Sequence, residues 1–123
     1  MNTRQVYLAA ALALLLGGCS AGSASDRAQK LADDATKAVY NDDMAGLTAN
    51  MNPALVPSIT RAQLGDLADK MHALGSYQGL TPAGSDTLKS EYDFKAKFDK
   101  STWTVVIRLD GDGKIAAYRV APP

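Results

Sequence analysis

The sequence predicts an α+β fold, in which three helical segments precede a curved antiparallel sheet of three to four strands. In the first half of the chain, apolar residues recur at helical spacing; after Gly75 the period of the pattern changes to two. A run of Asp and Gly at residues 110–113 then predicts a tight hairpin turn. Helices followed by a meander of strands with one polar face favour helices packed on one face of the sheet.

Two helices are expected before residue 51. The first covers residues 26–40, where small and aliphatic side chains form one stripe and Lys and Asp take the opposite face. Ser25 or Asp26 can cap its start with a side-chain oxygen, and the acidic turn at 41–43 ends it. A shorter helix is expected over residues 43–50.

The third helix starts at a capping box, in which Thr60 accepts a bond from the backbone of Gln63 and Gln63 reaches back. Leucine, alanine and methionine then follow at core spacing, and Gly75 supplies the left-handed residue that commonly ends a helix. The loop before this helix is bracketed by Pro53 and Pro57.

Four strands are expected after Gly75. A weak strand covers residues 77–81 and ends before Pro82, and a long strand with strict alternation covers residues 88–99. The next strand presents the apolar side chains of residues 103–109, and the return strand covers residues 114–120.

The N-terminal segment has the three parts of a secretory signal: Arg4, an uncharged Ala- and Leu-rich run over residues 6–16, and two small residues before Cys19. The apolar run is too short to cross a bilayer, which takes about 20 residues. Leu16-Gly17-Gly18-Cys19 resembles the lipobox of bacterial lipoproteins. The resemblance implies that residues 1–18 are a signal peptide and that Cys19 carries acyl chains such as palmitate, which anchor the protein in a membrane.

The expected location is the cell envelope. Ser20 stands where an Asp would resemble the inner-membrane retention signal, so the resemblance implies the periplasmic face of the outer membrane in a bacterium with two membranes. In a bacterium with one membrane it implies the outer face. Residues 19–25 are expected to form the lipidated tether, and residues 26–123 a single domain of unknown function.

Charge and composition exclude several classes of function. The chain has 13 Lys and Arg against 13 Asp and Glu, and loss of Arg4 with the signal peptide leaves 12 against 13. A chain so balanced has no electrostatic reason to bind nucleic acid. With one His and one Cys, and that Cys lipidated, we expect no metal cluster, disulfide or cofactor.

The order of motifs resembles the nuclear-transport-factor-two-like superfamily, also called cystatin-like, and within it an uncharacterised bacterial family. The resemblance is carried by segments spread over residues 26–123: Asn41-Asp42-Asp43, Asn52-Pro53-Ala54-Leu55, Thr60 to Leu64, Leu74-Gly75-Ser76-Tyr77 and Asp112-Gly113-Lys114-Ile115. It implies a cone-shaped domain with a cavity between sheet and helices, and pairing of two copies through the open sheet face.

His72, Ser90 and Tyr92 are the candidate pocket residues. His72 is the only histidine and lies on the third helix, beside core positions. Ser90 and Tyr92 are the polar-tipped residues of an otherwise apolar sheet face, and a buried Tyr92 hydroxyl needs a partner. A ligand or His72 could supply that partner, but a bond to backbone or water is the favoured explanation for Tyr92. Asp110 and Asp112 resemble the start of a calcium loop, but Lys114 and Ala121 occupy later ligand positions, so a plain hairpin is favoured.

The leading hypothesis is a non-enzymatic, membrane-tethered module that binds a small ligand or a partner protein of the envelope. It follows from the anchor, the expected pocket and the lack of a catalytic constellation. One alternative is an isomerase- or hydrolase-type enzyme that uses His72 and Tyr92, which requires His72 to point into the cavity. Another is an accessory subunit of a neighbouring envelope enzyme.

Overall fold

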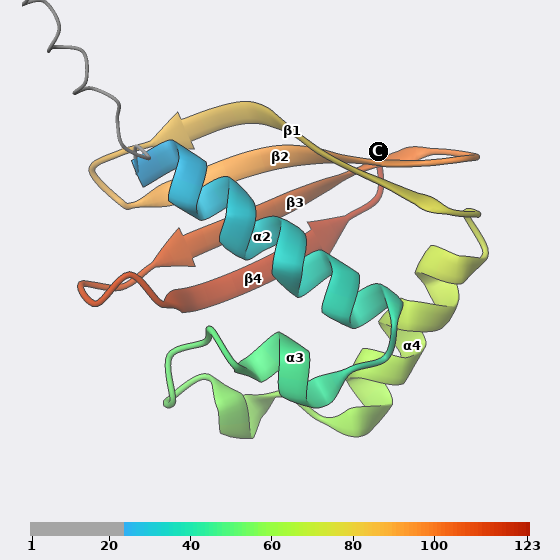
Figure 1. Ribbon diagram of the computed structural model, residues 1–123, viewed down its shortest axis with the longest axis horizontal. Helices are drawn as coiled ribbons and strands as arrows, with labels where there is room; N and C mark the ends of the chain where they lie inside the picture. The colour runs from blue at the N-terminus through green and yellow to red at the C-terminus, as the bar shows by residue number, and fades with distance from the viewer. Residues whose placement is uncertain (1–23) are drawn as a thin grey trace, which may run out of the picture.

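The computed structural model describes residues 24–123, and these form an α+β domain of helices followed by an open four-stranded antiparallel sheet (Figure 1). The helical part contains α2 (Ala24–Tyr40), α3 (Met44–Thr48), the 3₁₀ turn η2 (Val56–Ser58) and α4 (Arg61–His72). The expected signal peptide and Cys19 lie outside the described residues.

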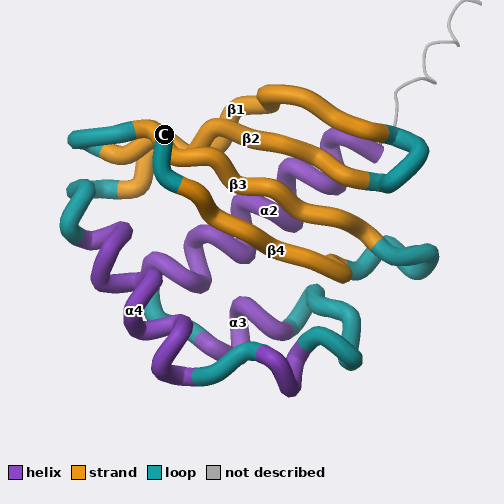
Figure 2. Tube along the Cα trace, turned by 180° about the vertical axis from the view of Figure 1, so that it is seen from behind, coloured by secondary structure: helices purple, strands orange, loops and turns teal. Residues whose placement is uncertain are grey.

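The sheet is a simple meander in the order β1-β2-β3-β4. Its strands are β1 (Tyr77–Asp86), β2 (Glu91–Phe98), β3 (Thr102–Leu109) and β4 (Ile115–Ala121). Helix α2 lies across one face of the sheet, while α3 and α4 pack against α2 and beside the β4 edge (Figure 2). Helix α2 makes the close contacts with β1, β2 and β3, while Leu47 of α3 and Leu64 and Met71 of α4 belong to the same core.

The alternation of β2 sorts its side chains as the sequence predicts. Tyr92, Phe94, Ala96 and Phe98 are buried under α2, and the intervening charged residues point to the open face. They meet Val105 and Ile107 of β3 in register. The inner face of the sheet and the alanine-rich side of α2 thus share one core. Small side chains on α2 allow the helix to approach the sheet closely.

Local signals position the third helix as expected. The Thr60 hydroxyl accepts a bond from the Gln63 backbone at 3.1 Å, and the Gln63 side chain accepts one from the Thr60 backbone at 3.1 Å. Gly75 follows the helix at φ 95°. Asp43 caps α3 through a 3.0 Å bond from the backbone N–H of Gly46.

Three expected boundaries are wrong. Helix α2 already contains Ser25 and Asp26, so neither is its cap, and Ser25 is helical although it was expected to end the tether. Strand β1 continues through Pro82 to Asp86. A proline is tolerated there because β1 is an edge strand, and the register shifts between Pro82 and Gly84. The long strand begins at Glu91 and not at Leu88, because residues 87–90 form the hairpin turn.

Candidate functional site: pockets around helix α2

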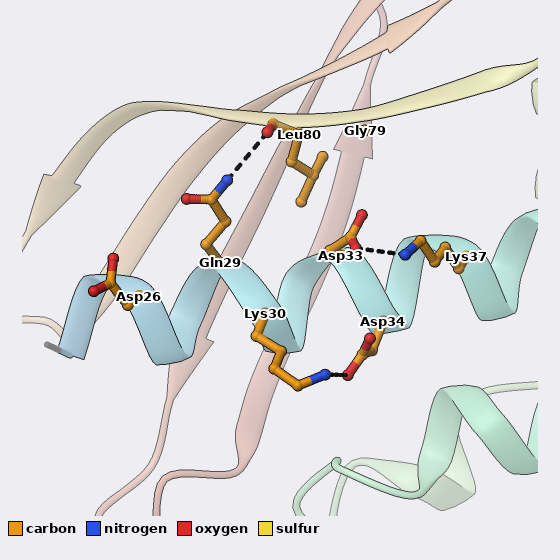
Figure 3. Close-up of a pocket in the computed structure, with 8 residues that line it drawn as sticks. All are labelled: Asp26, Gln29, Lys30, Asp33, Asp34, Lys37, Gly79 and Leu80. Atoms are coloured by element: carbon orange, nitrogen blue, oxygen red, sulfur yellow. Dashed lines mark hydrogen bonds and ion pairs between the residues drawn. The ribbon is translucent and has the colours of Figure 1, made fainter. Parts of the chain in front are cut away.

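A polar groove runs between the outer flank of α2 and the edge strand β1 (Figure 3). It has a volume of about 520 Å³ and is lined by Asp26, Gln29, Lys30, Asp33, Asp34, Lys37, Gly79 and Leu80. Lys30 pairs with Asp34 at 2.9 Å and Lys37 with Asp33 at 2.9 Å, each one helical turn apart. The Gln29 amide donates a 3.1 Å bond to the Leu80 carbonyl, which joins α2 to β1.

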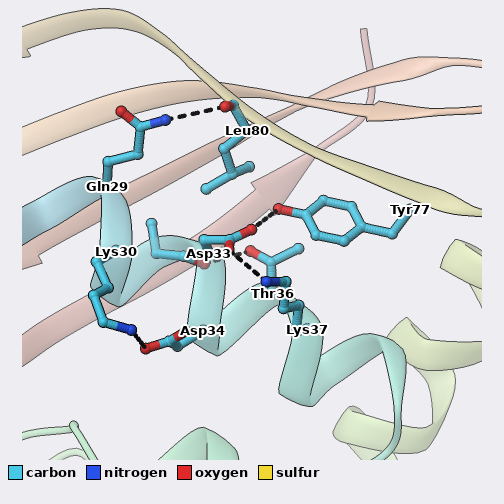
Figure 4. A network of polar contacts seen from close by, with 9 residues as sticks. Gln29, Lys30, Asp33, Asp34, Thr36, Lys37, Tyr77 and Leu80 are labelled. Atoms are coloured by element: carbon cyan, nitrogen blue, oxygen red, sulfur yellow. Dashed lines mark hydrogen bonds and ion pairs between the residues drawn. The ribbon is translucent and has the colours of Figure 1, made fainter. Parts of the chain in front are cut away.

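The carboxylate of Asp33 is the centre of the polar network in this groove (Figure 4). It accepts a 2.7 Å bond from the Tyr77 hydroxyl and pairs with Lys37. Burial alone would raise the pKa of Asp33, but the bonds from Tyr77 and Lys37 outweigh it and hold the pKa below its ordinary value. Burial and the same bond raise the pKa of Tyr77. Asp33 is thus a fixed carboxylate that holds β1 on α2, and it is unsuited to proton transfer near neutral pH.

An apolar pocket lies on the other side of α2, between the helices and the β4 edge. Its volume is about 230 Å³, and its walls are Val39, Leu47, Met51, Leu55, Ser58, Ile59, Gln63, Leu64, Leu67 and Tyr118. Only Ser58 and Gln63 add polar side chains besides Tyr118, and both of them are exposed. A mainly apolar concavity with few polar groups is the usual form of a small-molecule site.

Tyr118 forms a neutral polar wall of the apolar pocket. Its hydroxyl lies 2.8 Å from the Thr36 hydroxyl, which itself donates to the Ala32 carbonyl at 2.7 Å. Burial raises the pKa of Tyr118, so the phenol stays protonated. Because Thr36 is fully buried, this pair fixes β4 on α2 in the centre of the core.

A third hollow, the Tyr92 pocket, lies where α2 begins. It has a volume of about 200 Å³ and is lined by Ser25, Pro82, Ala83, Gly84, Ser85, Tyr92 and Phe94. Tyr92 is only 6% exposed, as the sequence argument for a buried tyrosine requires. Within residues 24–123, no group hydrogen-bonds to its hydroxyl.

The other two candidate pocket residues do not join Tyr92. His72 is exposed at the end of α4, where its ring meets the Tyr40 ring edge-on with centroids 4.4 Å apart. Ser25 of the Tyr92 pocket and Tyr40 lie at opposite ends of α2, about 22 Å apart at 1.5 Å per residue. Ser90 is not on the sheet face: it sits in the β1–β2 turn at φ 52°. The cavity geometry that the enzyme alternative requires is therefore not formed by His72.

The Asp110 turn is built as a hairpin and tied to the helical part. One oxygen of Asp110 accepts the backbone N–H groups of Asp112 and Lys114 at 2.8 and 2.9 Å. The other oxygen accepts the Asn52 amide at 2.7 Å. These N–H donors hold the pKa of Asp110 below its ordinary value. Among the described residues, no three His, Cys, Asp or Glu side chains cluster as a metal site.

Comparison of the chain with protein-family models, with curated proteins and with solved structures gives no match. Across residues 24–123, no helix has the length and apolar character needed to span a bilayer. Residues 24–123 thus form an α+β domain whose hollows include the apolar pocket, the polar groove and the small pocket at Tyr92.

Sequence reasoning missed the walls of the apolar pocket. Leu55 lies between Pro53 and Pro57 and Ile59 follows Pro57, in a segment where apolar residues carry no periodic signal. Tyr118 lies on the last strand, and Thr36, the hydrogen-bond partner of its hydroxyl, is 82 residues away in the sequence. The available hint was the excess of apolar side chains in residues 51–59, a loop that would be polar if it were fully solvated.

Proposed function

We propose that this chain is a lipid-anchored lipoprotein of the cell envelope that binds a small apolar ligand in the apolar pocket between α2, α3, α4 and β4. The observation that carries the ligand part is the pocket itself, whose walls are aliphatic and whose few polar groups lie at its rim and at Tyr118. The lipobox-like residues 16–19 support the anchored location. Membership of the cystatin-like superfamily, with its cone-shaped domain, is part of the same proposal.

The pocket volume restricts the size of the ligand. At about 30 Å³ for each water-sized group, a pocket of about 230 Å³ holds roughly seven or eight such groups. The ligand is therefore a small aromatic or branched aliphatic molecule and not a long acyl chain. No Lys, Arg, Asp or Glu lines the pocket, so the ligand is neutral.

Binding is tested with indole as a neutral probe of matching size, added to the full chain carrying ¹³C-labelled methyl groups. Saturable shifts are expected at the methyl signals of Ile59 and Leu67, which line the pocket from two different segments. Leu67→Trp fills the space and abolishes the shifts, whereas Leu88→Trp, on a fully exposed turn, leaves them unchanged. Equal titration curves for wild type and Leu67→Trp would exclude this pocket as the site.

The anchor is tested separately by growth with labelled palmitate. Cys19 is the only cysteine of the chain, so label is expected in the wild-type protein and absent from Cys19→Ala. The same pair of proteins should differ in location, with the wild type in the membrane fraction. Label retained by Cys19→Ala would overturn the lipoprotein proposal without touching the pocket.

Self-association through the open sheet face is part of the proposal. Along β2 this face presents two acids, Glu91 and Asp93, followed by two bases, Lys95 and Lys97. A two-fold axis that sets two β2 strands antiparallel would place acids over bases. Sedimentation of the full chain at low and high salt checks this, with a dimer expected at low salt only. A monomer at both would overturn it.

A further inference from the structure

The hydroxyl of Tyr92 differs from those of the other tyrosines that the structure describes. Tyr40 donates to the Gly75 carbonyl at 2.8 Å, Tyr77 donates to Asp33 at 2.7 Å, and Tyr118 bonds with Thr36 at 2.8 Å. Tyr92 is as buried as a core residue, yet its hydroxyl has no partner within residues 24–123. A hydrogen-bond donor in a buried side chain is destabilising when it has no acceptor, so this hydroxyl has a reason to bind an acceptor from outside the chain.

The Tyr92 pocket supplies the surroundings of such an acceptor. Phe94, Pro82 and Ala83 make its walls apolar, and the hydroxyls of Ser25 and Ser85 add neutral polar groups. None of the seven lining residues is charged. A carboxylate or phosphate would find no cation there, whereas a neutral carbonyl with an attached chain fits both the walls and the donor.

The position of this pocket favours a membrane source for the ligand. It opens beside the start of α2 and the β1–β2 turn, which lie together at one end of the molecule in both views (Figures 1 and 2). That turn carries Leu88, which is 97% exposed. The turn is ordered, because Asp86 accepts the backbone N–H groups of Leu88 and Lys89 at 3.2 and 3.1 Å. An ordered turn that displays a bare leucine is suited to insertion among lipid chains.

We infer that the Tyr92 pocket binds the ester end of one acyl chain of a bilayer glycerolipid, with the Tyr92 hydroxyl donating to the ester carbonyl and Leu88 inserted beside it. The pocket of about 200 Å³ holds roughly six or seven water-sized groups, which is the ester and the first few methylenes. This site is distinct from the apolar pocket. It rests on the proposed membrane location only for the source of the ester.

The chemistry is tested with methyl hexanoate as the probe and hexanoate as its charged counterpart, on the full chain kept soluble by an amphipathic polymer. Methyl hexanoate should shift the ring signals of Phe94 and Tyr92 saturably, and hexanoate should bind at least tenfold more weakly. Tyr92→Phe should weaken binding of the ester about fivefold to tenfold, because it removes the donor and leaves the walls. Tyr40→Phe, whose hydroxyl is bonded within the chain, should leave the affinity unchanged.

Equal affinity of wild type and Tyr92→Phe for the ester, or no saturable shift at all, would overturn the site and leave water as the partner of the hydroxyl. The source is tested in phosphatidylcholine nanodiscs, where magnetisation transfer from lipid methylenes to the Phe94 ring is expected and Leu88→Asp should reduce it. Ester binding without this transfer would overturn the membrane source. Indole binding, measured at the methyl signals of Ile59 and Leu67, tests the proposed function separately, because those residues line the apolar pocket and not the Tyr92 pocket.

Discussion

The hydroxyl of Tyr77 donates a 2.7 Å hydrogen bond to the carboxylate of Asp33, and this bond joins the edge strand β1 to α2 across 44 positions of the chain. The carboxylate is held at the same time by Lys37, one turn further along the helix. The Tyr77–Asp33 hydrogen bond therefore satisfies a half-buried charge and fixes the position of β1 on α2. Its loss should be visible both in stability and in acid sensitivity.

Tyr77→Phe is expected to lower the free energy of unfolding by about 1–2 kcal/mol near neutral pH, because a hydrogen bond to a charged acceptor is lost. Asp33 has a folded-state pKa below its ordinary value of 3.8. Its stabilising effect is thus complete above that value and is lost as the pH falls through the folded-state pKa. Urea unfolding at neutral and at acidic pH should show a weaker acid dependence in Tyr77→Phe than in wild type.

Tyr40→Phe is the matched control for this effect. It also removes one hydroxyl bond, to the Gly75 carbonyl, but no carboxylate takes part. It should lower stability by about 1 kcal/mol and leave the acid dependence as in wild type. If Tyr77→Phe and Tyr40→Phe share the same pH profile, the Tyr77–Asp33 bond does not set the pKa of Asp33.

Tyr118→Phe and Tyr92→Phe are expected to differ in stability although both tyrosines lie on the inner face of the sheet. Tyr118→Phe removes the bond to Thr36, and a loss of about 1 kcal/mol is expected. Tyr92→Phe removes a hydroxyl with no partner in residues 24–123, so stability should stay unchanged or rise. Thermal unfolding of the two variants in ligand-free buffer makes the comparison. A clear loss in Tyr92→Phe would mean that its hydroxyl is already satisfied, for example by a bound water.

Features that depend on neighbouring residues were predicted better than features that depend on tertiary packing. The capping box of Thr60 and Gln63 and the left-handed Gly75 are confirmed, because each depends on residues within one helical turn. Pro82 was expected to end its strand, but the edge position of β1 and the shifted register nearby accommodate it. Leu88 and Ser90 continue the alternation of β2 in sequence, yet the chain turns there.

The sites were harder to predict because they combine distant segments. Tyr92 was identified from its alternation, which determines that it is buried but not which hollow its ring lines. The apolar pocket joins Leu55 of an irregular loop to Tyr118 of the last strand. Leu55 and Tyr118 are brought together by the packing of α2 between the sheet and the other helices, and no local sequence pattern predicts that they line one pocket.

Comparing the stability of Gly75→Ala with that of Gly79→Ala separates the cost of a steric clash from the cost of backbone strain. Both glycines have positive φ, 95° and 112°, so alanine should cost about 1–2 kcal/mol at either position. At Gly75 the new Cβ would also lie 2.5 Å from a carboxylate oxygen of Asp99, which accepts the Ser76 backbone N–H and the Gln78 amide. At Gly79 nothing lies within 4 Å. Urea midpoints should therefore fall further for Gly75→Ala, and equal midpoints would show that Asp99 moves aside freely.

Gly65→Ala is expected to stabilise the protein, because Gly65 lies inside α4 and a Cβ there would meet nothing within 4 Å. Alanine in place of glycine in a helix interior contributes about 0.5–1 kcal/mol, through the reduced freedom of the unfolded chain. Gly46→Ala is the matched control in α3, where the new Cβ would collide with the capping carboxylate of Asp43 and disrupt its bond to the residue 46 backbone. Chemical unfolding should thus show a gain for Gly65→Ala and a loss for Gly46→Ala, and a loss in both would mean that α4 has no room for added side chains on its exposed flank.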